Sequence, residues 1–119
     1  MKFYEYIETL VFREDWKTLG LSDGELKDLQ GYLNDNPEEG KIISGTGGLR
    51  KLHWSAKDKG KRGGARVLYV LFNRQAKIYL ISAFGKSVKE NISNTDKALF
   101  KELIKTLESC NNSKRGENE

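Results

Sequence analysis

The first twenty residues change from a strand-like to a helix-like pattern of apolar positions. Residues 3–8 mix aromatic, β-branched and acidic side chains, a combination that predicts a first strand. Thr9 is a residue type that caps helices, and the apolar residues after it recur at i, i+4 and i+7. The pattern predicts a helix that begins after Thr9 and ends at Gly20. Its apolar residues are Phe12, Trp16 and Leu19.

A second amphipathic helix is predicted directly after the first. Ser22 precedes Glu25 by three residues, the spacing of a capping box, in which each side chain bonds the backbone amide of the other residue. Pro37 disfavours a helical conformation at the residue before it, so we expect the helix to end near Asn36. The short connection between the two helices predicts an antiparallel pair. The apolar residues of the second helix are Leu26, Leu29 and Leu33.

Residues 38–48 interrupt the apolar pattern and predict a loop. Four of them are glycines, which indicates positive φ angles or a close approach of neighbouring backbone. A phosphate-binding loop of the P-loop type needs a following helix and a lysine at a fixed spacing. Neither is present here, so we exclude that function for this segment.

Three strand-like runs come next. The run 49–55 leads into a glycine- and lysine-rich loop, 67–72 is almost entirely apolar, and 77–84 has Ile-Tyr-Leu-Ile at its centre. Runs that are apolar on both faces are typical of central strands covered on both sides. Residues 73–76 have the composition of a turn. We therefore expect an antiparallel meander in which 49–55, 67–72 and 78–83 are neighbouring strands.

A third helix is predicted near the end of the chain. Ser93 or Thr95 can cap it, and apolar residues then recur on one helical face. From Asn111 onward the chain is polar. We therefore expect one domain over residues 1–110 and a polar, frayed tail over residues 111–119. The apolar residues of the helix are Leu99, Phe100, Leu103, Ile104 and Leu107.

The predicted elements define an α+β domain with the order β-α-α-β-β-β-α. We expect a mostly antiparallel, twisted sheet with the two N-terminal helices on one face, and the last helix across an edge or on the other face. No apolar run approaches the roughly 20 residues that a membrane span needs, so no membrane partner is expected. The single cysteine, Cys110, excludes an internal disulfide and is typical of a reducing cytosol. We therefore expect a cytoplasmic protein.

The positive charge of the chain is concentrated in one stretch. Residues 48–66 carry seven basic residues and one acid, a net charge of +6, against +4 for the whole chain. Basic side chains neutralise phosphates and release condensed counterions, so this stretch favours a polyanion as partner. A solvated hairpin tip that lysines keep soluble is the alternative. The basic residues are Arg50, Lys51, Lys57, Lys59, Lys61, Arg62 and Arg66.

Three segments of the chain resemble the RelE superfamily of bacterial toxins, and within it the HigB-type branch most. The similarity extends over about residues 3–108, and the order of elements agrees with the order predicted above. The segments are Gly-Thr-Gly-Gly-Leu-Arg-Lys-Leu-His-Trp at 45–54, Gly-Lys-Arg-Gly-Gly-Ala-Arg-Val-Leu-Tyr at 60–69, and Ile-Ser-Ala-Phe-Gly-Lys at 81–86.

This resemblance implies a ribosome-dependent endoribonuclease that cuts mRNA in the decoding site without a metal ion or another cofactor. It also implies a cognate antitoxin from the same operon, of the helix-turn-helix type, through which alone the toxin would reach operator DNA. The residues that match the family's site are Lys51, His53, Arg66 and Lys86. Residues expected to hold RNA phosphates are Arg50, Lys57, Lys59, Lys61 and Arg62.

Two departures from the family's pattern leave other functions open. Well-known members carry an arginine after the lysine that matches Lys86, and this chain has Ser87. Some members carry a tyrosine in the final segment, whereas residues 90–95 contain none. One alternative is therefore a binding-only toxin of the ParE-like branch, which poisons DNA gyrase. The other is a basic RNA-binding module without catalytic chemistry.

The residues themselves suit RNA cleavage by transesterification. That reaction needs a deprotonated 2′-hydroxyl, stabilised charge on the phosphorane and a proton for the leaving oxygen. Lys51 and His53 are two residues apart on a predicted strand and so share a face. Repulsion within a cluster of cations favours the neutral form of a lysine or histidine, which can then act as a base. Arginine keeps its proton, so Arg66 on the next strand is suited to binding phosphate and stabilising transition-state charge.

Each candidate residue also has a structural interpretation. A lone histidine such as His53 is more often structural or simply exposed, and Lys86 is equally suited to a turn. Arg66 shares strand parity with Leu68 and Val70, so the alternative to a site role is an inward side chain that bonds backbone carbonyls. The aromatic residues nearby are expected in the core rather than as stacking platforms for RNA bases. They are Trp54, Tyr69 and Tyr79.

Overall fold

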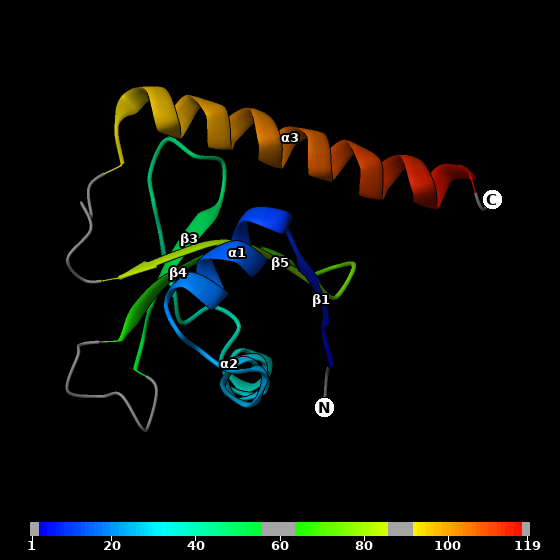
Figure 1. The fold of residues 1–119 in the computed structure, drawn as a ribbon. Helices are drawn as coiled ribbons and strands as arrows, with labels where there is room; N and C mark the ends of the chain where they lie inside the picture. The colour runs from blue at the N-terminus through cyan, green and yellow to red at the C-terminus, as the bar shows by residue number, and fades with distance from the viewer. Residues whose placement is uncertain (1–2, 56–63, 86–91, 118–119) are drawn as a thin grey trace.

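The computed structural model describes residues 3–55, 64–85 and 92–117. Its elements are β1 (Glu5–Glu8), α1 (Leu10–Thr18), α2 (Asp23–Asp35), β2 (Lys41–Ile42), β3 (Leu49–Trp54), β4 (Ala65–Phe72), β5 (Lys77–Gly85) and α3 (Asn94–Glu117). The five strands form one sheet, with α1 and α2 on one face and α3 across the other (Figure 1). The predicted α+β class and the placement of the first two helices are confirmed.

The strands lie in the order β1-β5-β4-β3-β2. β3, β4 and β5 are adjacent and antiparallel, which confirms the predicted meander. β1 pairs with β5 in parallel, with Glu5 opposite Lys77, so the first strand of the chain is joined to the last. The observed sheet is therefore mostly antiparallel, as expected.

The segment 38–48 is not entirely a loop, which corrects the sequence analysis. β2 pairs antiparallel with β3, with Lys41 opposite Lys51 and Ile42 opposite Arg50. A strand of two residues is too short to show an alternating pattern in sequence. The expectation of positive φ angles at the glycines is confirmed, with values of 83°, 79° and 126° at Gly45, Gly47 and Gly48.

Gly40 allows the backbone to approach Tyr69 closely. The Tyr69 hydroxyl accepts a hydrogen bond from the Gly40 amide at 2.9 Å and donates one to the Pro37 carbonyl at 2.8 Å. A Cβ atom at position 40 would lie 2.7 Å from Cε1 of Tyr69. These contacts fix the chain between α2 and β2 and leave Tyr69 fully buried.

The larger hydrophobic core lies between the sheet and the two N-terminal helices. Apolar residues of α1 and α2 meet side chains from β3, β4 and β5. Full burial of one large apolar side chain stabilises a fold by about 1.5–3 kcal/mol. The buried residues of this core are Phe12, Trp16, Leu29, Leu33, Leu52, Val67, Tyr69, Ile78, Leu80 and Ala83.

Polar contacts hold α1 against β5. The Asp15 carboxylate accepts hydrogen bonds from the Ser82 hydroxyl at 2.8 Å and from the Ala83 amide at 3.0 Å. The hydroxyl of Thr9, the predicted cap, accepts a bond from a helix amide and donates one to the Ile81 carbonyl at 2.7 Å. The start of α1 is therefore tied to the last strand as well as capped.

The predicted capping box forms, but the predicted antiparallel helix pair does not. The Ser22 amide donates to the Glu25 carboxylate at 3.1 Å, and the Glu25 amide donates to the Ser22 hydroxyl at 3.2 Å. Figure 1 looks down the axis of α2, whereas α1 lies across the view. Gly20, with φ of 75°, redirects the chain between them. α1 packs mainly along β5, so the two helices cross rather than run side by side.

The second core lies between the sheet and α3 and is smaller. Ser93 caps α3, because its hydroxyl accepts a hydrogen bond from the Asp96 amide at 3.1 Å. The helix continues to Glu117, through residues that the sequence analysis assigned to a frayed tail. Asn111 is buried there, and its side-chain oxygen accepts a bond from Lys77 Nζ at 3.2 Å. The buried residues of this core are Leu49, Leu68, Val70, Ile81 and Ile104.

Tyr6 joins β1 to α2 and is expected to make the stability sensitive to alkaline pH. Its hydroxyl donates to the Gln30 carbonyl at 2.7 Å. Burial, followed by repulsion from Tyr4 and Asp35, raises the pKa of Tyr6 from 10.0 to about 12. Because the folded chain holds this proton more tightly than the unfolded chain, the contribution is complete below pH 10 and is lost as the pH rises through 12.

The measurement is the urea midpoint of the wild type and of Tyr6→Phe across that pH range. We expect a smaller alkaline decrease for Tyr6→Phe, because the variant has no phenol to lose its proton at this position. Burial also raises the pKa of Tyr69, so part of the decrease is expected to remain. An equal alkaline decrease in both proteins would contradict the assignment to Tyr6.

Candidate nucleic-acid interface

The sheet brings Lys51, His53 and Arg66 to one face. Leu49 packs beneath α3, and side chains alternate along β3, so Lys51 and His53 also lie on the α3 face. His53 is directly opposite Arg66 on β4. Directly opposite residues of antiparallel strands point the same way, with Cβ atoms about 4.5–5.5 Å apart. The juxtaposition expected from the sequence is therefore present.

These three side chains differ in their access to solvent. His53 is exposed, Lys51 is half-buried, and Arg66 is only 6% exposed. Arg66 lies in a cross-strand row between His53 on β3 and Phe84 on β5. The inward orientation considered for Arg66 is thus the one observed. Arg66 supplies a fixed positive charge below the surface, and His53 presents a titratable group at the surface.

β2 adds a cation that the sequence analysis missed. Lys41 is exposed and lies directly opposite Lys51, so the two lysines share the α3 face. Lys41 lies outside the basic stretch 48–66, and only the pairing of β2 with β3 brings it near. A hairpin predicted across the turn 43–48 would have placed Lys41 beside Lys51.

Arg50 does not lie with the other candidates. It is directly opposite Ile42 and Tyr69, on the face covered by α1 and α2. Its Nη1 donates hydrogen bonds to the carbonyls of Glu38 at 3.1 Å and Gly40 at 2.8 Å. Arg50 therefore secures the chain before β2, and the geometry gives no support to a phosphate contact from this residue.

The remaining candidates fall outside the described residues, so their positions stay predictions. The second glycine of the Gly-Gly-Ala-Arg motif, Gly64, is required by the backbone geometry at the start of β4. Its φ is 66°, and a Cβ atom there would lie 1.9 Å from the Trp54 carbonyl oxygen. The start of β4 thus contacts the end of β3 backbone to backbone. The candidates outside the described residues are Lys57, Lys59, Lys61, Arg62 and Lys86.

The three aromatic residues considered as stacking platforms lie in the core, as predicted. Tyr69 is fully buried on the side of α1 and α2. Trp54 packs on the same side, with its ring centroid 6.0 Å from that of Tyr32. Tyr79 packs in the second core, edge-on to Phe72 at 5.5 Å. None of the three therefore lies beside His53 in position to stack on an RNA base.

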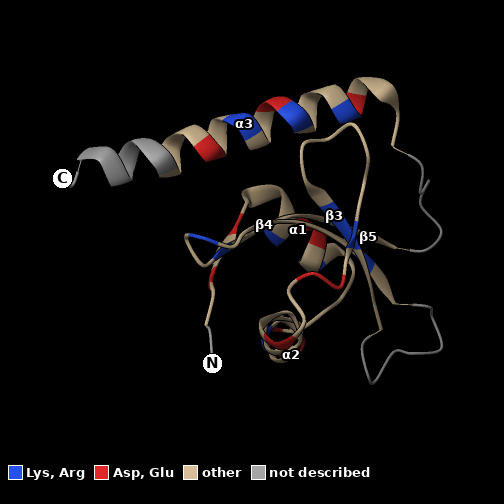
Figure 2. Cartoon of the chain, turned by 180° about the vertical axis from the view of Figure 1, so that it is seen from behind, with Lys and Arg blue, Asp and Glu red and all other residues tan. Residues whose placement is uncertain are grey.

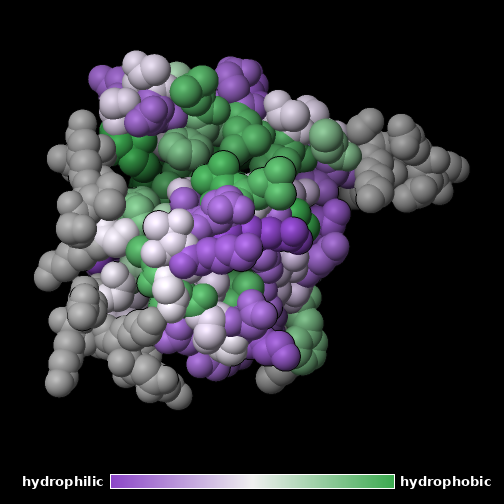
Figure 3. All heavy atoms as spheres, viewed as in Figure 1, coloured by the Kyte–Doolittle hydropathy of each residue, from purple (hydrophilic) through white to green (hydrophobic). Residues whose placement is uncertain are grey.

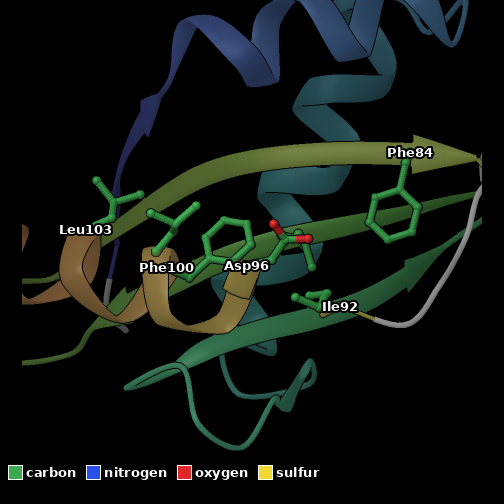
Figure 4. Close-up of a pocket in the computed structure, with 7 residues that line it drawn as sticks. Phe84, Ile92, Asp96, Phe100 and Leu103 are labelled. Carbon is green, nitrogen blue, oxygen red and sulfur yellow. The ribbon is translucent and has the colours of Figure 1, made fainter. Parts of the chain in front are cut away.

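A mostly apolar pocket adjoins the cationic row. It lies between the sheet and the first turns of α3, with a volume of about 530 Å³ (Figure 4). Phe84, opposite Arg66, and Leu68, opposite Lys51, form its sheet side. Apart from the Asp96 carboxylate the lining is apolar, which does not suit a phosphate. The pocket is lined by Leu68, Phe84, Ile92, Asp96, Leu99, Phe100 and Leu103.

The cations of the candidate interface lie on the strands rather than on the helix that crosses the same face. Figure 2 shows Lys and Arg on β3, whereas Lys alternates with Asp and Glu along α3. Within the described ranges, no three His, Cys, Asp or Glu side chains gather closely enough to hold a metal ion. None of the helices in those ranges combines the length and the apolar character needed to cross a membrane.

Comparison with known proteins identifies the family of this chain. The family model of the RelE toxin of the RelE/RelB toxin–antitoxin system matches residues 11–116. The chain therefore belongs to the RelE toxin family and is a toxin of a toxin–antitoxin system. Its fold is similar to that of free E. coli RelE, solved as a double arginine-to-alanine mutant, with a TM-score of 0.54 and 16% sequence identity. That match covers 83% of this chain and 96% of E. coli RelE.

Proposed function

We propose that this protein is a ribosome-dependent endoribonuclease that cleaves mRNA by attack of a ribose 2′-hydroxyl on the adjacent phosphate. The observation that carries the proposal is the placement of His53 directly opposite Arg66, with Lys51 two residues away on the same face. Membership of the RelE toxin family supports a target in translation. Because the family's arginine is replaced by Ser87 and its tyrosine is missing from residues 90–95, the experiment must test whether this protein cleaves mRNA.

His53, Arg66 and Lys51 each have a separate role in the proposed reaction. His53, which is exposed, accepts the proton of the 2′-hydroxyl. Arg66 keeps its charge and stabilises the phosphorane. Lys51 binds the phosphate and can replace His53 as the base. The bond between phosphorus and the 5′-oxygen breaks as the 2′-oxygen attacks, and the leaving 5′-oxygen takes its proton from solvent. Since these side chains supply both the base and the positive charge, we propose a reaction without metal or cofactor. Lys86 is retained as a fourth site residue on the resemblance to the superfamily.

The proposal extends to the partners of the toxin. A cognate antitoxin is expected from the neighbouring gene, of the helix-turn-helix type, and the toxin meets operator DNA only through it. An acidic or amphipathic antitoxin segment would cover the cationic face or lie along the helices. Exposed Leu99 and Leu103, at 64% and 37%, support an amphipathic segment. Figure 3 shows hydrophobic residues gathered over α3 and the surface below it. With mRNA and ribosomes as targets, the protein acts in the cytoplasm.

The test is induced expression in bacteria with mapping of mRNA ends, together with purified protein and mRNA with and without ribosomes. We expect growth arrest, cleavage only in the presence of ribosomes, and products with 2′,3′-cyclic phosphate ends, which attack by the 2′-hydroxyl generates. Co-expression of the neighbouring gene is expected to relieve the arrest. The control is the same culture before induction, in which the amount and the length of the mRNA are measured for comparison.

Other outcomes would identify the alternative functions. Filamentation and DNA damage with intact mRNA would indicate a gyrase poison of the ParE-like branch. RNA binding with intact mRNA and normal growth would indicate a non-catalytic RNA-binding module. Either result would overturn the proposed cleavage, and neither would change the membership of the RelE family. The position of the chain within the HigB-type branch stays a prediction.

A further inference from the structure

We propose that Lys41 binds an RNA phosphate, so that the RNA crosses the sheet from the His53–Arg66 pair, over Lys51, to the edge strand β2. This inference rests on the proposed function in taking RNA as the ligand. It adds a binding residue outside the basic stretch 48–66 and a direction for the RNA across the strands rather than along them.

The geometry consists of two parallel cross-strand rows on the α3 face. Lys41 and Lys51 are directly opposite each other in one row, and His53 and Arg66 in the next. Lys51 and His53 are two residues apart on β3, so the rows are separated by about 6.8 Å. The rows together place four cationic or protonatable side chains over three adjacent strands, with Lys41 at the outer edge.

Lys41 and Lys51 place two like charges directly opposite each other. Like charges directly opposite each other on antiparallel strands destabilise the pairing. β2 has only two residues with which to offset that repulsion. Within the described ranges, Lys41 makes no ion pair with a carboxylate. A phosphate between the two ammonium groups would replace repulsion with charge-assisted hydrogen bonds. The arrangement is therefore one that a bound anion stabilises.

A different explanation for Lys41 is protection of the sheet edge. β2 is an outer strand, and lysines on outer strands prevent the sheets of two molecules from pairing. A negative charge serves that purpose as well as a positive one. A phosphate contact, in contrast, requires a positive charge. The sign of the charge at position 41 therefore separates the two explanations.

The experiment measures binding of a fluorescein-labelled single-stranded RNA as a function of KCl concentration. For Lys41→Gln we expect binding weaker by up to about fivefold, the range of an exposed ion pair. We also expect the slope of log affinity against log salt to be smaller by about 0.7, the value for one phosphate contact to a single strand. Lys41→Arg should retain wild-type binding. Lys41→Glu should bind more weakly than Lys41→Gln.

Lys27→Gln is the matched control, because Lys27 is exposed on α2, on the opposite side of the sheet. It removes the same charge and is expected to leave both affinity and slope nearly unchanged. On ribosomes, Lys41→Gln should raise the KM for mRNA cleavage and leave kcat unchanged, since Lys41 binds the substrate without contacting the reacting atoms.

The outcomes separate this inference from the proposed function. A wild-type salt slope in Lys41→Gln overturns the inference even when the wild type cleaves mRNA. Wild-type binding by Lys41→Glu does the same and favours edge protection. A reduced slope in Lys41→Gln, with a wild type that cuts no mRNA on ribosomes, overturns the proposed cleavage and leaves the phosphate contact standing. No measurable RNA binding by the wild type overturns the inference.

Discussion

Replacement of Arg66 by alanine is expected to abolish growth arrest in a chain that still folds. Loss of a well-placed charge stabiliser lowers a rate by about 10²–10³. Arg66 is buried in its cross-strand row, so no exposed side chain can move into its place. His53→Ala is expected to weaken the toxin less. Loss of a general base costs about 10²–10⁴, but Lys51 can accept the proton instead. Cleavage of mRNA on ribosomes measures both variants.

Thermal melts and two further variants control this comparison, because a buried arginine can also contribute to folding. Arg66→Lys keeps a positive charge and loses the planar guanidinium, so an intermediate rate is expected. Arg74→Ala removes an exposed arginine from the turn between β4 and β5 and is expected to leave cleavage unchanged. A folded Arg66→Ala protein that arrests growth at full strength would place the site elsewhere on the molecule.

Gly64→Ala is expected to destabilise the fold strongly. Its Cβ atom would lie 1.9 Å from the Trp54 carbonyl oxygen and 2.8 Å from the Trp54 carbonyl carbon, so the backbone of β3 or β4 must shift. The positive φ of 66° is itself unfavourable for alanine. The left-handed conformation and the overpacking together cost about 2–5 kcal/mol. Urea unfolding at neutral pH measures the loss.

Gly31→Ala is the matched control and is expected to have the opposite effect. Gly31 lies inside α2, and a Cβ atom there would meet no other atom within 4 Å. Alanine in a helix interior is more favourable than glycine by about 0.5–1 kcal/mol, so this variant should be more stable than the wild type. A Gly64→Ala protein as stable as the wild type would show that the contact between β3 and β4 at this point is dispensable.

The sequence predicted the elements in which local signals and tertiary packing agree. Thr9 caps α1 and Ser22 caps α2 as expected, because a side-chain oxygen near free helix amides acts within one turn. The strands with long apolar runs occupy the centre of the sheet, since burial on both faces leaves little room for polar residues. The family resemblance added the site residues, of which Lys51, His53 and Arg66 share a face.

Features that depend on distant pairing were not predictable from local patterns. β2 exists because Lys41 and Ile42 pair with β3, so Lys41 was missed. The bonds of Arg50, which was expected to hold RNA phosphate, to the carbonyls of Glu38 and Gly40 were missed for the same reason. α3 continues past residue 110, and the contact of Asn111 with Lys77 on β5 joins residues far apart in sequence. The crossing of α1 and α2 likewise follows from packing on the sheet rather than from the length of their connection.

The parallel pairing of β1 with β5 has a consequence for the order in which the chain folds during synthesis. The backbone of Glu5 can pair with β5 only after Lys77, 72 positions further along the chain, has been synthesised. At bacterial rates of translation this delay is about 4–14 s. The first core needs Ile78, Leu80 and Ala83 of the same strand, so it closes only after β5 has left the ribosome. Neither the pairing of β1 nor the first core can therefore be completed before residue 83 has been made.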